Sequence, residues 1–154
     1  MSSMRESGKV SILGLGAIAI AGMIVASFVF AKDEPANVGV RFMDALARHD
    51  VDTLTSLSRT GESDPAAVEK EKKRLHDAWD FCVNTAAKHF LFTWRITSAT
   101  ATSENHATVT VMETKAGPSA YEQKYELSLE KEGGKWVVDV GAISRDMFPA
   151  LPSN

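Results

Sequence analysis

The feature that constrains this chain most is an uncharged apolar run near its N-terminus. It extends from Val10 to Ala31 and is bounded by Lys9 and Lys32. An α-helix rises about 1.5 Å per residue, so a run of this length reaches across a hydrocarbon core of roughly 30 Å. The run therefore predicts a membrane-spanning helix over residues 10–31, which places the protein at a membrane.

A cleaved secretory signal peptide is the alternative interpretation of the same residues. Such a signal has a basic start, an apolar region of about 7–15 residues and a small-x-small cleavage site. Arg5 and Lys9 supply the basic start, and residues 29–31 supply the cleavage site. The apolar run is longer than a signal needs, so we favour an uncleaved single-pass anchor.

The charges on either side of the run predict its orientation. Arg5 and Lys9 precede it, whereas Lys32 is followed at once by Asp33 and Glu34. Basic residues stay on the cytoplasmic side of a membrane helix. We therefore expect an inner (cytoplasmic) membrane protein with its N-terminus in the cytoplasm and its C-terminal domain in the periplasm or cell exterior. Cleavage of residues 1–31 would release a periplasmic or secreted domain.

The chain divides on this basis into four parts. Residues 1–9 form a cytoplasmic N-terminus, residues 10–31 the anchor or signal, residues 32–147 one folded domain, and residues 148–154 a loosely held tail with two prolines. An apolar fraction of 44% and a charged fraction of 24% are ordinary for a globular domain. The formal net charge of −3 argues against nucleic acid as a partner.

Helical spacing of apolar residues predicts three helices after the apolar run. The first extends from Pro35 to about Arg48. Asp50 is placed to cap a short second helix over residues 51–57. The third follows Asp64 and extends from Pro65 to about Lys88, with proline in the first turn, where it is tolerated.

After residue 89 the apolar period changes from 3.6 to 2, which is typical of strands with one buried face. The inward-reading residues are Phe90, Phe92, Trp94, Ile96, Ala107, Val109, Val111, Tyr121, Tyr125, Leu127, Leu129, Trp136, Val138 and Val140. Short connections, of which Gly133-Gly134 is a strong hairpin signal, separate these runs. The predicted fold class is α+β, with three helices packed on a four-stranded antiparallel meander sheet.

Residues at both ends of this order carry a family resemblance. The opening residues are Val40, Phe42, Met43, Ala45, Leu46, His49, Asp50, Leu54 and Leu57. The closing residues are the strand from Tyr125 to Leu129 and the hairpin from Lys131 to Asp139. In these residues the stretch from Pro35 to Ser144 resembles the nuclear-transport-factor-two-like superfamily, whose fold is also called cystatin-like, in its membrane-tethered exported bacterial type.

The resemblance implies a cone-like domain in which a curled sheet and its helices enclose a pocket. Members of the superfamily include isomerases, cyclases and dehydratases as well as non-catalytic binding and scaffolding domains. The enzymes place Asp, His or Tyr inside the cone. We match no catalytic motif in this chain, and we expect inner faces dominated by Phe, Trp, Val and Leu.

No pattern in the sequence specifies a catalytic, metal or cofactor site. His76 and Asp80 share a helix face, but no third ligand is identifiable, so we interpret them as a solvated charged face. Cys82 lies on an apolar helix stripe and His89 is two helical turns away, too far for direct contact. The candidates for lining a pocket are Trp79, Trp94, Tyr121, Tyr125 and Trp136.

Three functional hypotheses follow. The first is a non-enzymatic, membrane-tethered binding or assembly domain, which forms a homo-oligomer or joins other subunits of a membrane-associated complex. The second is an exported pocket protein that binds a small apolar ligand. The third and least favoured is an enzyme of the isomerase or cyclase type, which requires an ionisable residue with a perturbed pKa inside the cone.

Overall fold

A computed structural model of the chain describes residues 34–153. The chain divides between Ala31 and Lys32, and the described residues belong to the second unit, Lys32–Asn154. The predicted membrane span, residues 10–31, lies outside the described residues. Within residues 34–153, no helix is both long enough and apolar enough to cross a membrane.

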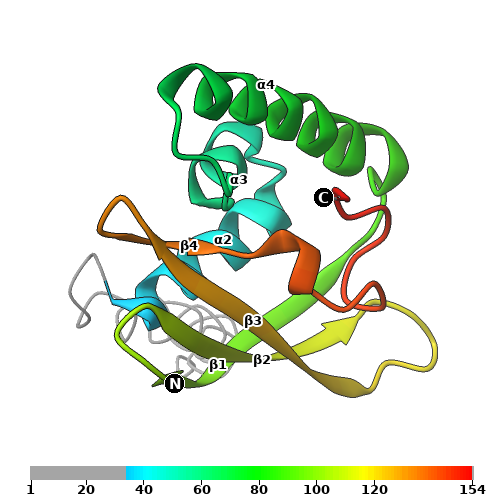
Figure 1. The fold of residues 1–154 in the computed structure, drawn as a ribbon. Coiled ribbons are helices and arrows are strands. Elements are labelled where there is room, and N and C mark those ends of the chain that lie inside the picture. Colours follow the sequence, from blue (N-terminus) through cyan, green and yellow to red (C-terminus); the bar gives the residue numbers. More distant parts are fainter. Residues whose placement is uncertain (1–33, 154) are drawn as a thin grey trace, which may run out of the picture. The chain divides into compact units, whose positions relative to one another are not determined.

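Three helices open the described domain, as the sequence predicts (Figure 1). They are α2 (Pro35–Arg48), α3 (Val51–Leu57) and α4 (Pro65–Phe81), and a π-helical turn, η1 (Cys82–Ala86), extends α4. The predicted caps form: the Asp50 carboxylate accepts a hydrogen bond from the Thr53 amide at 3.1 Å. The Asp64 carboxylate accepts one from the Ala67 amide at 3.0 Å. Each cap satisfies an amide that the first turn of its helix leaves without a partner.

Four strands follow and pair in the order β1-β2-β3-β4, each antiparallel to the next. Their bounds are β1 (Phe92–Ala101), β2 (His106–Lys115), β3 (Glu122–Glu132) and β4 (Lys135–Val138). Gly133 and Gly134 turn β3 into β4 with φ angles of 59° and 79°, a conformation that glycine adopts without strain. The predicted α+β class, with three helices on a four-stranded meander, is confirmed.

The core lies between the helices and one face of the sheet. In Figure 1, α2 and α3 lie between α4 and the strands. The fully buried side chains of this layer include Phe42, Leu46, Trp79, Val109 and Leu127. The α2 helix approaches β2 so closely that a Cβ atom added at Gly39 would lie 2.7 Å from Cγ1 of Val109. Glycine at this position therefore sets how near the helix lies to the sheet.

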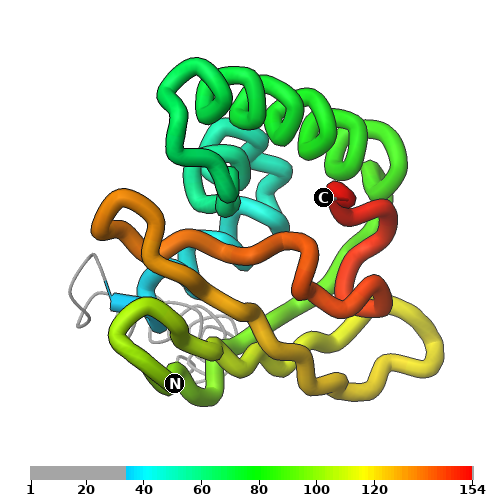
Figure 2. The backbone as a smooth tube through the Cα atoms, in the orientation of Figure 1, coloured from blue at the N-terminus to red at the C-terminus, as the bar shows by residue number. Residues whose placement is uncertain are grey.

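The segment after β4 differs from the prediction. We predicted a loosely held tail over residues 148–154, but Phe148 is fully buried. Its ring meets those of Phe90 and Phe92 edge-on, with centroids 5.2 Å and 6.0 Å away. Figure 2 follows this segment, in red, from β4 back to the underside of α4. The prediction was wrong because proline content describes the local chain and not the apolar surface that a distant segment offers.

Backbone carbonyls hold the same segment in place. The thiol of Cys82 donates to the carbonyl oxygen of Pro149 at 3.2 Å. Arg145 Nη1 donates to the carbonyl of Leu151 at 2.5 Å, and Arg74 Nη1 of α4 donates to that of Ser153 at 2.9 Å. The bonds of Arg74 and Cys82 join the C-terminal segment, residues 139–153, to α4 and η1, and the bond of Arg145 lies within the segment. The segment is thus part of the folded domain.

Phe148→Ala should lower the free energy of unfolding by about 3–5 kcal/mol, because it removes a fully buried aromatic side chain and leaves a cavity. The matched control is Phe81→Ala on α4, where the ring is 56% exposed; it should change stability by roughly 0.5 kcal/mol or less. Urea unfolding of the full chain in mild detergent, followed by tryptophan fluorescence, measures both. Equal effects of the two substitutions would contradict a packed C-terminal segment and support the predicted loosely held tail.

Candidate functional site

The inward face of β2 does not stay apolar to its end. Ala107, Val109 and Val111 point into the core, and the same parity continues to Glu113 and Lys115. The Glu113 residue is only 1% exposed. Neither of its carboxylate oxygens finds a hydrogen-bond partner anywhere in the described part of the chain. A buried polar group normally has such a partner, so Glu113 is the exceptional residue of this domain.

Strand pairing identifies the residues that lie beside Glu113 on the sheet. It lies directly opposite Trp94 of β1 and Gln123 of β3. Side chains that face one another across antiparallel strands share a face of the sheet, so all three lie on the inward side. Lys115, two residues further along β2, lies on that side as well.

This environment alters the acidity of Glu113. Burial raises the pKa of the Glu113 carboxyl to about 7, because a low-dielectric surrounding penalises the charged form. The positive charge of Lys115 acts in the opposite direction and limits the rise in pKa. The group therefore exchanges its proton near neutral pH.

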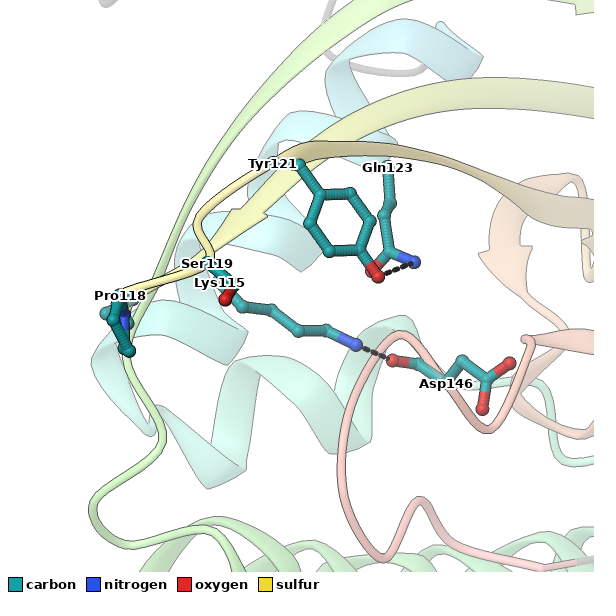
Figure 3. A pocket seen from close by; sticks show the side chains of 8 residues that line it. Lys115, Pro118, Ser119, Tyr121, Gln123 and Asp146 are labelled. Atoms are coloured by element: carbon teal, nitrogen blue, oxygen red, sulfur yellow. Dashed lines mark hydrogen bonds between the residues drawn. The ribbon is translucent and has the colours of Figure 1, made fainter.

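An open pocket lies next to this residue, between the β2–β3 loop and the C-terminal segment (Figure 3). Its volume is about 500 Å³, and its walls are residues 115–119 together with Tyr121, Gln123 and Asp146. Two of the lining residues, Lys115 and Gln123, are the neighbours of Glu113 on the inward face. Glu113 thus does not line the pocket itself but lies beside two residues that do.

The polar side chains of the pocket wall are joined to one another. Lys115 Nζ donates to the carbonyl oxygen of Asp146 and to the Tyr125 hydroxyl, the latter at 3.3 Å. That hydroxyl donates to Oε1 of Gln123 at 2.9 Å, and Nε2 of Gln123 donates to the Tyr121 hydroxyl at 3.3 Å. Figure 3 shows the bonds from Lys115 to Asp146 and between Gln123 and Tyr121. The network joins these side chains to one another and leaves Glu113 outside it.

Three of the five candidate pocket residues come together here. Tyr121 lines the pocket and is 65% exposed. Tyr125 is buried and reaches the pocket wall through its hydroxyl. Trp94 is partly buried and lies opposite Glu113.

The other two candidates lie elsewhere. Trp79 is fully buried between α4 and α3, where its indole nitrogen donates to the hydroxyl of Ser58 at 2.9 Å. Trp136 is on β4, and its ring has the ammonium of Lys131 5.2 Å from its centroid. Neither residue is among those that line the pocket.

The remaining chemical candidates do not assemble a site. His76 Nε2 lies 3.3 Å from a carboxylate oxygen of Asp52, and Asp80 accepts a hydrogen bond from Asn84. Burial raises the pKa of the Cys82 thiol to about 11, which keeps it in its unreactive protonated form. Among residues 34–153, no three His, Cys, Asp or Glu side chains gather in a way that would hold a metal ion.

The sequence analysis missed Glu113, Lys115, Gln123 and Asp146. A usable signal existed for the first two, because the inward parity of Ala107, Val109 and Val111 continues to them unchanged. The expectation of apolar inner faces is therefore incomplete at the end of β2. Asp146 gave no signal, because only its backbone carbonyl enters the network and the fold alone brings that carbonyl to Lys115.

No family model and no curated protein matches the chain. Similar solved structures include a SEC-C motif containing protein from Rhodopseudomonas palustris, 18% identical over 77% of this chain and 84% of that one, with a TM-score of 0.48. A ketosteroid isomerase-like protein from Erwinia carotovora atroseptica is 18% identical over 66% and 85%, with a TM-score of 0.43.

A third similar structure is a domain of unknown function from Nostoc punctiforme, described as having a cystatin-like fold. It is 10% identical over 66% of this chain and 68% of that one, with a TM-score of 0.44. The membrane-tethered exported type stays a prediction.

Glu113→Gln should make stability less dependent on pH. The wild-type carboxyl has a pKa of about 7 when folded and a reference value of 4.5. The folded state therefore takes up the proton first as the pH falls, and the free energy of unfolding rises. From pH 8 to pH 5 this contributes roughly 2–3 kcal/mol, which a neutral amide cannot contribute. Urea unfolding of both proteins at each pH measures the difference.

The control for this experiment is Glu126→Gln, which removes an exposed carboxylate from the neighbouring strand β3. This variant should keep the wild-type pH dependence. If Glu113→Gln kept it too, the Glu113 carboxyl would not be the group that takes up the proton.

Proposed function

We propose that this domain binds a small organic molecule in the pocket between the β2–β3 loop and the C-terminal segment. The observation that carries the proposal is the buried carboxylate of Glu113, which has no partner in the described chain and lies beside two residues that line an open pocket. Burying such a group without a hydrogen bond costs stability. A cost of this kind is typical of residues kept for a function.

The size and walls of the pocket support a small ligand. A volume of about 500 Å³ lies within the range of about 300–1,000 Å³ that is usual for small-molecule sites. The Tyr121 ring offers apolar surface, and the Gln123 and Lys115 side chains offer polar groups. The ligand we propose is therefore amphipathic, whereas the second hypothesis from the sequence was a small apolar ligand.

Binding is the function we propose, and acid–base catalysis is the alternative. An acid–base enzyme needs a second group that stabilises the charge developing on the substrate. The Lys115 ammonium has a third N–H, and the Tyr121 hydroxyl only accepts a hydrogen bond within the wall, so both keep a donor. Glu113 does not line the pocket with them, so the wall supports recognition of a ligand.

We also propose that residues 10–31 hold this domain at a membrane, with the pocket in the periplasm or cell exterior. The length of the uncharged run and the position of Arg5 and Lys9 support the anchor and its direction. A tethered binding domain of this kind could signal occupancy of its pocket to a second copy or to another membrane subunit.

Binding in the pocket can be tested with a fragment library that contains neutral, cationic and anionic compounds. NMR of the full chain in mild detergent should show fragments that shift the amide signals of Ser119, Tyr121 and Gln123. Tyr121→Ala should weaken these fragments roughly fivefold or more, because it removes the aromatic wall. Phe81→Ala, an equally large but distant truncation, should leave their binding unchanged. A library in which no fragment shifts these signals would reject the pocket as a binding site.

The membrane anchor can be tested by the intact mass of the protein in the membrane fraction. We expect the full-length mass, with or without Met1, in material that only detergent extracts, because an apolar helix of this length stays in the bilayer. A mass that begins at Lys32, in the soluble fraction, would instead establish a cleaved signal peptide.

A further inference from the structure

The polar side chains of the pocket wall and the neighbouring Glu113 differ in whether they have a hydrogen-bond partner. The Lys115, Tyr121, Gln123 and Tyr125 side chains all have hydrogen-bond partners within the wall. The two oxygens of Glu113 have none among the described residues. An ionised carboxylate only accepts hydrogen bonds, so the group that would complete this site is a donor.

Charge distinguishes between the donors that a ligand could supply. The titratable groups around the site are Glu113 and Lys115 from β2, Tyr121 and Tyr125 from β3, and Asp146 from the C-terminal segment. Asp146 enters the wall through its backbone carbonyl, and its carboxylate points away from Lys115 in Figure 3. The Lys115 ammonium is turned toward that carbonyl, and no hydrogen bond joins it to the Glu113 carboxylate. A cationic donor would give the ionised Glu113 carboxylate the ion pair that Lys115 does not form.

Two aromatic side chains lie near Glu113 and the pocket. Trp94 lies opposite Glu113 on the inward face, and Tyr121 stands at the pocket entrance. Aromatic faces attract cations and pack against apolar or aromatic groups. Lys115 is the basic neighbour of Glu113 on this face. Arg95, next to Trp94 on β1, pairs with Glu122 on the opposite face of the sheet.

We infer that the ligand of this pocket is an organic amine, whose ammonium group binds the Glu113 carboxylate and whose apolar or aromatic body lies against Tyr121. The inference rests on the proposed binding function and names its ligand class. Binding requires the Gln123 and Lys115 side chains to move aside, because they line the pocket and Glu113 does not. A hydrogen bond between an ammonium and a carboxylate is roughly twice as strong as one between neutral groups, which offsets this rearrangement.

The experiment compares three probes of similar shape: phenethylamine, 2-phenylethanol and 3-phenylpropanoate. Each is titrated into the full chain in mild non-ionic detergent at pH 8, with calorimetry for affinity and NMR for the position of binding. We expect the amine to bind at least about tenfold more tightly than the alcohol, because only the amine brings an opposite charge to Glu113. The amide signals of Ser119, Tyr121 and Gln123 should shift.

Variants then assign the effect to one residue. Glu113→Gln keeps the shape of the side chain and removes its charge, so it should weaken the amine roughly tenfold and weaken the alcohol much less. Glu126→Gln, on an exposed position of β3, is the matched control and should change neither probe. Wild-type affinity for the amine should also fall at least about tenfold from pH 8 to pH 5.5, because Glu113 becomes protonated while the amine stays charged.

Other outcomes overturn the inference in distinguishable ways. Equal binding of amine and alcohol, unaffected by Glu113→Gln, would mean that the carboxylate is not the recognition group. Preferential binding of 3-phenylpropanoate would transfer that role to Lys115. If all three probes fail while library fragments shift the pocket signals, the amine class is wrong and the binding function stands. If the library fails as well, both are rejected.

Discussion

The close packing of α2 on the inward face of the sheet is the constraint on which the other parts of this domain depend. Gly39 allows the helix backbone to approach Val109 at the centre of β2, where a larger residue would meet its side chain. With that face covered, the alternation has one outcome: every second residue is buried from Ala107 to Glu113 of β2 and from Tyr125 to Leu129 of β3. The helix cannot retreat without exposing the core, and the sheet cannot shift by one residue without turning its charged positions inward.

The same constraint explains why Glu113 is buried. Parity alone puts its side chain on the covered side of the sheet, at the end of a run whose earlier members are apolar. An apolar residue there would be more stable, since the carboxylate oxygens have no partners in the described domain. Under the proposed binding function the neighbouring pocket gives a reason for this residue, because a group that is costly in the free protein would gain a partner when a donor binds. Stability and the proposed function are then opposed at this position.

The C-terminal segment connects the pocket to the core. Phe148 fills the space between β1 and α4 beside Phe90 and Phe92, and two residues earlier the Asp146 carbonyl receives the Lys115 ammonium. One short segment therefore completes both the apolar interior and the polar wall. The wall is held at both sides, by the paired strands and by a segment that its own buried side chains keep in place.

The sequence by itself determined the order of the elements, the caps at Asp50 and Asp64, and the meander with its glycine hairpin; the third helix, predicted to reach about Lys88, ends as an α-helix at Phe81. These features are local: a period of 3.6 or 2, a capping carboxylate and a pair of glycines act within a few residues of where they are written. The sequence also carried the parity that turns Glu113 inward. What it lacked was any indication of which distant residues cover each position. Only the tertiary structure decided that Phe148 is core, that Trp79 and Trp136 lie away from the pocket, and that no donor from residues 34–153 reaches Glu113. The reason is that burial depends on all the segments that meet at a point.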